Sequence, residues 1–156
     1  MSLIPGTLVL VDGMGILLRG PAGSGKSDTA LALIHAGHRL VADDAVDIRR
    51  MDDRLVGSPP AAGEGLLCLR GPGLIDVVAC FGTGAVARSA TVDRVVDLVD
   101  EPRPATTEAD WQPIRIEGVC CPRMALSPGR PLPALLEVLA AGGRTSPARP
   151  ELLACG

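Results

Sequence analysis

Residues 20–27 read GPAGSGKS, which matches the pattern G-x-x-x-x-G-K-[ST] at every fixed position. The apolar run 16–19 comes directly before this stretch, and residues 26–36 carry apolar side chains at helical spacing. In a loop between a strand and a helix, glycines let successive backbone N–H groups turn around phosphate oxygens, and the positive helix N-terminus adds to the attraction. The eight residues therefore predict a phosphate-binding loop and an α/β nucleotide-binding domain.

The motif also assigns roles to individual residues. Lys26 is expected to reach the β and γ phosphates of ATP, and the Ser27 hydroxyl is expected to bind Mg²⁺. The alternative is a Gly-rich turn that matches by chance, which the flanking strand and helix disfavour. The expected nucleotide-binding residues are Gly20, Pro21, Ala22, Gly23, Ser24, Gly25, Lys26 and Ser27.

Phosphoryl transfer also needs carboxylates, one to hold the metal and often one to accept a proton. Asp43 and Asp44 follow the apolar run 39–42, where a strand beside the phosphate helix would end. Ligands of open α/β sheets bind at the carboxyl ends of strands. The pair is thus a candidate for both roles, and the competing interpretation is two solvated turn aspartates.

Two arginines lie in Gly/Pro turns that could aim a guanidinium at a phosphate. Arg70 begins RGPG, and Arg130 ends SPGR. Each is equally compatible with an ordinary surface position, and Arg130 is retained as a candidate catalytic residue.

The rest of the chain alternates short apolar runs with turn signals, which predicts one domain over residues 1–141 with a central mixed sheet. Residues 100–110 are polar and turn-rich, and we expect an exposed crossing there. Residues 142–156 are rich in Gly and Pro and are expected to form a flexible tail. The predicted strands are 7–11, 16–19, 39–42, 46–50, 54–56, 66–69, 74–81 and 92–99, and the predicted helices are 26–36 and 132–141.

Composition narrows the classes of partner. The chain has one Trp, one Phe, no Tyr and a formal charge of −3, so it offers neither stacking platforms nor a broad basic surface for nucleic acid. No apolar run approaches the ~18 residues of a membrane span, which favours a cytoplasmic protein without a membrane partner. The five cysteines lack metal-binding spacing and are expected to be buried, reduced thiols.

Residues 26–47, KSDTALALIHAGHRLVADDAVD, resemble the catalytic domain of the HPr kinase/phosphorylase family, in which the phosphate loop, helix and Asp-Asp turn occur in this order. Weaker similarities are LRGPGLIDV at 69–77, FGTGAV at 81–86 and SPGR at 127–130. Together they cover most of residues 5–140.

The resemblance implies a kinase that transfers phosphate from ATP to a serine of an HPr-like phosphocarrier, with a weak reverse phosphorylase activity. It implies that Asp44 accepts and returns the serine proton and that Asp43 lies near the metal. It also implies a short form without the family's separate N-terminal domain, as in some proteobacteria, where such forms are linked to nitrogen-type phosphotransferase regulation. The family assembles as hexamers, so a homo-oligomer is compatible with the resemblance.

Three positions depart from the family pattern. Pro5 stands where the family has a histidine that assists the catalytic aspartate, and Cys68 stands where it has a metal-binding glutamate. Arg103 is only a loose match to a later catalytic arginine. These departures leave two alternatives to the kinase: a nucleotide-sensing module that has lost efficient transfer, and a P-loop kinase for a small molecule, for which no Arg-rich lid is visible.

Overall fold

The computed structural model describes residues 2–102 and 108–142. Its centre is a six-stranded sheet in the order β11-β12-β10-β3-β2-β4. Strand β10 runs parallel to β3 and β12, and the other neighbours are antiparallel, so the prediction of a central mixed sheet is confirmed. The strands are β2 (Thr7–Val11), β3 (Met14–Arg19), β4 (Arg39–Ala42), β10 (Arg94–Asp97), β11 (Gln112–Ile116) and β12 (Val119–Ala125).

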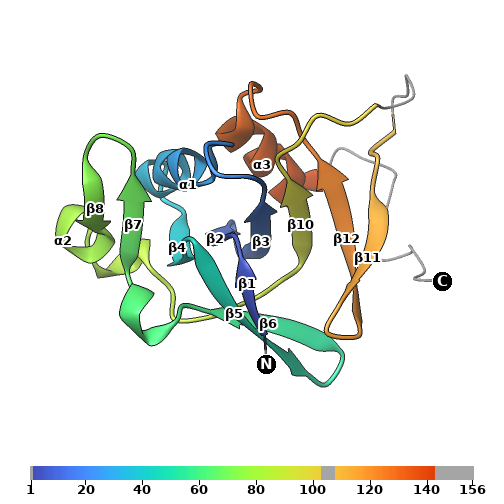
Figure 1. The fold of residues 1–156 in the computed structure, drawn as a ribbon, viewed down its shortest axis with the longest axis horizontal. Coiled ribbons are helices and arrows are strands. Elements are labelled where there is room, and N and C mark those ends of the chain that lie inside the picture. Colours follow the sequence, from blue (N-terminus) through green and yellow to red (C-terminus); the bar gives the residue numbers. More distant parts are fainter. Residues whose placement is uncertain (1, 103–107, 143–156) are drawn as a thin grey trace.

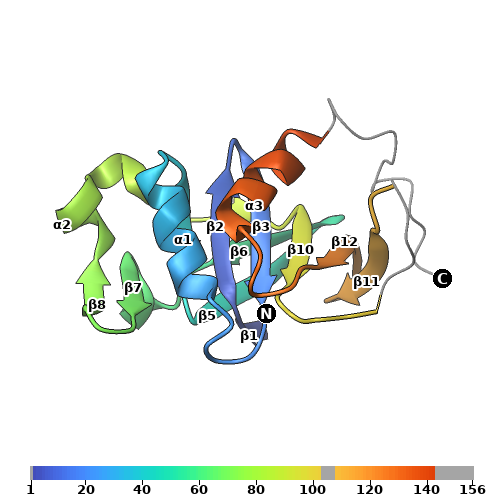
Figure 2. The same ribbon diagram turned by 90° about the horizontal axis from the view of Figure 1, so that it is seen from above.

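Helices α1 (Lys26–His35) and α3 (Leu132–Ala140) cover one face of this sheet and lie side by side (Figure 2). Val9 and Leu18 belong to the core beneath these helices, whereas Leu8 and Leu17 belong to the core on the opposite face. Successive strand residues point to opposite faces, so β2 and β3, buried on both faces, appear in the sequence as continuous apolar runs.

A second, four-stranded antiparallel sheet covers the other face, in the order β1-β5-β6-β9 (Figure 1). Its strands are β1 (Ser2–Pro5), β5 (Ala45–Met51), β6 (Arg54–Ser58) and β9 (Ala90–Thr91). The predicted strands 46–50 and 54–56 are confirmed and pair with each other as a hairpin. Gly15 allows the close approach of β3 and β9, because a Cβ atom there would lie 1.7 Å from the Thr91 carbonyl oxygen.

A hairpin of β7 (Leu66–Leu69) and β8 (Gly73–Asp76) projects at one end of the molecule and continues into α2 (Val77–Phe81) (Figure 1). The prediction of one strand over 74–81 is therefore wrong beyond Asp76. The Asp76 carboxylate accepts a hydrogen bond from the Ala79 N–H at 3.1 Å and caps the helix. A short apolar run fits a strand and a buried helical turn equally well, and here the cap favours the helix.

Several other elements differ from those that the sequence predicts. The predicted strand 92–99 is shorter in the structure, where β10 covers only Arg94–Asp97. Strands β1, β11 and β12 are present although the sequence patterns did not predict them. Residues 61–63 and 83–85 form short 3₁₀ turns. Arg103, much of the expected crossing 100–110 and the expected tail beyond Gly142 lie outside the described residues. In the described ranges, no helix is both long and apolar enough to cross a membrane.

The cysteine prediction is confirmed only in part. Cys121 is buried and reduced, as expected, but Cys68 and Cys80 are exposed. Cys120 is disulfide-bonded and so is not a reduced thiol. Cys68 is exposed because β7 alternates, with Leu67 and Leu69 directed into the core and the intervening side chain directed outward.

Candidate functional site

The phosphate loop connects the end of β3 to the start of α1. Gly23 and Gly25 adopt left-handed backbone angles, with φ of +83° and +95°, which only glycine adopts without strain. No side chain caps the N-terminus of α1, so its first N–H groups are not occupied by a capping residue. Left-handed glycines and uncapped helix N–H groups are the backbone features that the motif predicts for a loop that binds an anion.

A cavity of ≈ 360 Å³ opens over this loop. Its walls come from the loop and the first turn of α1, from Asp43 and Asp44 after β4, and from Cys68 and Arg70 in the β7–β8 hairpin. The tertiary structure therefore brings together groups from three separate stretches of the chain.

Ser27 and Asp43 both line the cavity and are in direct contact. The Ser27 hydroxyl lies 2.9 Å from Oδ1 and 3.0 Å from Oδ2 of Asp43. The same carboxylate accepts hydrogen bonds from the Thr7 hydroxyl at 2.8 Å and from the Cys68 N–H at 3.1 Å. These donors hold the Asp43 carboxylate in one orientation next to Ser27.

This arrangement offers hard oxygen donors, which are the ligands Mg²⁺ prefers. Among the residues the structure describes, no group of three or more His, Cys, Asp or Glu side chains could hold a metal alone. Mg²⁺ is commonly bound by one or two protein oxygens together with substrate phosphates. Ser27 and Asp43 fit that mode, in which the ion arrives with a nucleotide.

Asp44 differs from its neighbour in every contact. It is exposed, and its backbone is left-handed at φ +69°, a region that Asp and Asn tolerate better than most residues. Its carbonyl accepts a hydrogen bond from the Gly6 N–H at 3.0 Å, while its carboxylate has no hydrogen bond or ion pair in the described ranges. Asp44 is one of the residues that line the cavity.

Pro5 lies close to Asp44, because β1 pairs Pro5 with Ala45 in the second sheet. The strand next to the Asp44 turn therefore supplies no titratable side chain at this position. The sequence departure at Pro5 thus falls beside the candidate base.

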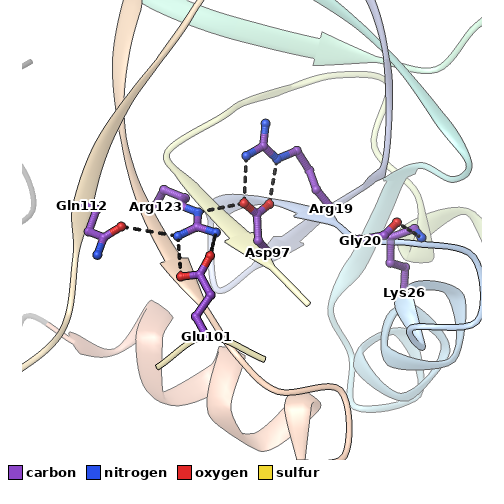
Figure 3. Close-up of polar contacts among 7 residues, drawn as sticks. All are labelled: Arg19, Gly20, Lys26, Asp97, Glu101, Gln112 and Arg123. Carbon is purple, nitrogen blue, oxygen red and sulfur yellow. Dashed lines mark hydrogen bonds and ion pairs between the residues drawn. The ribbon is translucent and has the colours of Figure 1, made fainter. Parts of the chain in front are cut away.

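The Nζ atom of Lys26 donates to the Gly20 carbonyl oxygen at 2.7 Å (Figure 3). It also donates to the Pro21 carbonyl oxygen at 3.1 Å. Of the predicted loop residues, Ala22, Gly23, Gly25, Lys26 and Ser27 line the cavity. Gly20 and Pro21 accept the lysine hydrogen bonds, and Ser24 is buried, with 5% of its surface exposed.

The two candidate arginines differ in their position relative to the cavity. Arg70 lines the cavity, and a Cβ atom added to Gly23 would lie 3.6 Å from its Nη2, so the guanidinium is next to the phosphate loop. Arg130 is exposed in the turn before α3 and is not among the cavity-lining residues.

Sequence reasoning missed a charged cluster at the entry to the loop (Figure 3). Arg19 donates from Nε and Nη2 to the two oxygens of Asp97, at 2.7 and 2.9 Å. Arg123 Nε donates to the same carboxylate at 2.7 Å and forms a second ion pair with Glu101. Burial raises the pKa of Asp97, but the hydrogen bonds from Arg19 and Arg123 outweigh it and lower that pKa below its usual value.

Comparisons with known proteins show which family this chain resembles. Residues 2–147 match the family model described as the HPr serine kinase C-terminal domain. The chain is 41% identical over 143 residues to HPr kinase/phosphorylase of Geobacillus thermodenitrificans, covering 88% of this chain and 46% of that relative. It is 42% identical over 149 residues to the enzyme of the same name from Clostridium acetobutylicum, covering 90% and 48%. The chain spans about half the length of these curated relatives.

A solved structure is similar over nearly its whole length. The Hpr(Ser) kinase/phosphatase from Coxiella burnetii superposes with a TM-score of 0.86 at 33% sequence identity. The match covers 92% of this chain and 91% of that one.

Proposed function

The chain belongs to the HPr serine kinase C-terminal domain family, and we propose that it is an ATP- and Mg²⁺-dependent kinase that phosphorylates a serine of an HPr-like phosphocarrier protein. The observation that carries the proposal is the contact between Ser27 and Asp43 in a cavity that also exposes Lys26 and Asp44. A phosphate loop, an oxygen-donor pair and a free carboxylate are the parts that phosphoryl transfer needs.

The nucleotide would lie with its β and γ phosphates against the loop N–H groups. Lys26 would exchange its hydrogen bonds to Gly20 and Pro21 for phosphate oxygens. Mg²⁺ held by Ser27, Asp43 and the phosphates would neutralise charge on the transferring group. Arg70, which lines the same cavity, would add a second positive charge there.

The acceptor serine would approach from the open side of the cavity, next to Asp44. Its hydroxyl oxygen would bond to the γ phosphorus as the bond between that phosphorus and the bridging oxygen of ADP breaks, and the hydroxyl proton would pass to Asp44. Asp43 is engaged by three donors, whereas the Asp44 carboxylate is not, which supports this division of roles.

A weak phosphorylase activity belongs to the proposal. An oxygen of inorganic phosphate would bond to the phosphoserine phosphorus as the bond to the serine oxygen breaks, which gives pyrophosphate, and Asp44 would pass the proton of the attacking phosphate to the serine oxygen. The names of the relatives, kinase/phosphorylase and kinase/phosphatase, support a reaction in both directions. An HPr-like partner and ATP would place the protein in the cytoplasm. A homo-oligomer stays a prediction.

A nucleotide-sensing module without efficient transfer is the second candidate. Two observations favour it: Pro5 beside Asp44 supplies no titratable group, and Cys68 presents a thiol on the cavity wall. Both changes affect catalysis more directly than nucleotide binding.

Incubation with γ-labelled ATP, Mg²⁺ and an HPr-like carrier from the same cell separates the two candidates. The kinase transfers label to the wild-type carrier but not to a carrier whose acceptor serine is replaced by alanine. Lys26→Ala serves as the enzyme control. Nucleotide binding without label on the carrier would reject the kinase and favour the sensor.

A further inference from the structure

The charged cluster at the end of β3 is not explained by the proposed chemistry, because none of its members lines the cavity. Arg19 and Asp97 are opposite each other in the parallel pair β3 and β10, and both are the last residues of their strands. Arg19 directly precedes Gly20, the first residue of the phosphate loop. The ion pair therefore joins two strands at the point where the loop begins.

Backbone contacts also join the end of β10 to the start of the phosphate loop. The Leu98 N–H donates to the Arg19 carbonyl at 2.7 Å. A Cβ atom on Gly20 would lie 3.1 Å from the Leu98 carbonyl oxygen and 2.8 Å from Ser24 Oγ, so the first loop residue packs directly on the end of β10. The Gly20 carbonyl in turn accepts the hydrogen bond from Lys26.

The carboxylate of Asp97 also separates two positive charges. Arg19 Nη2 and Arg123 Nε both donate to Oδ2 of Asp97, at 2.9 and 2.7 Å, and the Asp97 side chain is only 13% exposed. Without that carboxylate, two guanidinium groups would face each other in a partly buried place. Like charges repel there, so Arg19 and the start of the loop would move.

We propose that Asp97 is a positioning residue that, through its two hydrogen bonds to Arg19, holds the phosphate loop against β10 in the geometry that binds the nucleotide phosphates. This inference rests on the proposed nucleotide binding. A positioning role and a general charge effect predict opposite changes in nucleotide affinity when Asp97 is replaced. Removing a negative charge near the loop would by itself tighten the binding of an anionic ligand, whereas a displaced loop binds it more weakly.

The test measures the dissociation constant for Mg-ADP by calorimetry, at a temperature where circular dichroism shows each variant folded. Asp97→Asn and Arg19→Gln should each weaken binding by about 10-fold, since small misplacements of binding groups are costly. The double variant with Asp97→Asn and Arg19→Gln has the net charge of the wild type. It should bind Mg-ADP no more weakly than whichever single variant has the lower affinity. Arg19→Lys, which cannot make two parallel hydrogen bonds, should restore only part of the affinity.

Glu101→Gln is the matched control, because it removes one negative charge from the same cluster but acts on Arg123 rather than Arg19. It should leave the dissociation constant unchanged or slightly lower. Equal or tighter binding by Asp97→Asn, or additive losses in the double variant, would overturn the positioning role. A wild-type protein that binds no nucleotide would instead overturn the proposed function together with this inference.

Discussion

The Ser27 hydroxyl lies 2.9 Å from the nearer carboxylate oxygen of Asp43, so the last residue of the phosphate-loop motif contacts the first carboxylate after β4. The two residues are 16 positions apart in the sequence. Their contact places the expected metal ligands next to each other, and it leaves Asp44 and Asp28 as the exposed acidic residues that line the cavity.

We expect ATP with Mg²⁺ to stabilise the fold through the phosphate loop. A ligand at about 100 times its dissociation constant adds ~2.7 kcal/mol to the free energy of unfolding. A thermal-shift measurement should show a higher melting temperature for the wild type with nucleotide. Lys26→Ala should lose most of that shift, whereas Arg49→Ala, which removes an exposed cation outside the cavity lining, should keep it. No shift with any nucleotide would reject the assignment of the loop.

Asp44→Asn should abolish most phosphate transfer while leaving nucleotide affinity unchanged. The substitution removes the proton acceptor, and loss of a general base costs ~10²-fold to 10⁴-fold in rate. Asn tolerates the left-handed backbone at this position, so the fold should be kept. Asp52→Asn is the matched control, because Asp52 is also exposed and left-handed at φ +59°. Transfer at the wild-type rate by Asp44→Asn would exclude this residue as the base.

Cys68→Glu should lower the Mg²⁺ concentration needed for half-maximal transfer. A thiol is a poor ligand for Mg²⁺, and a carboxylate at this place on the cavity wall would add an oxygen donor. Because Cys68 is exposed, a glutamate at this position would not be an unpaired charge in the core. Cys80→Glu, the same change at an exposed thiol outside the cavity lining, is the control. An unchanged Mg²⁺ dependence would indicate that Ser27, Asp43 and the phosphates already complete the coordination.

The stability contributed by Asp97 should depend on pH. Its pKa is lowered in the folded protein, so its contribution is present above the unfolded pKa of about 3.9 and is lost as the pH falls through the lower folded value. Urea unfolding should therefore show a large difference between the wild type and Asp97→Asn at pH 6 that shrinks toward pH 3. A difference that is the same at both pH values would mean that the carboxylate charge is not the source of the stability.

Much of the site follows from short stretches of sequence. The glycines, Lys26 and Ser27 are contiguous, and the left-handed turns at Gly23 and Gly25 are local properties that those residues encode. Asp43 and Asp44 could be assigned to the same site because they follow a strand directly after the phosphate helix. The central mixed sheet was predicted for a similar reason, since apolar runs alternate with turns and helical spacing.

Other features depend on contacts between distant parts of the chain. The sequence of a single strand does not specify which strands lie beside it, so the pairing of β3 with β10 could not be predicted. The Arg19–Asp97 ion pair, which joins residues 78 positions apart, depends on that pairing. The place of the β7–β8 hairpin brings Arg70 and Cys68, but not Arg130, to the cavity. The helix at 77–81 was likewise decided by the Asp76 cap and by the burial of Val77. Local backbone preferences therefore determined the phosphate loop from sequence alone, whereas long-range packing, whose energy depends on which surfaces meet, decided what surrounds it.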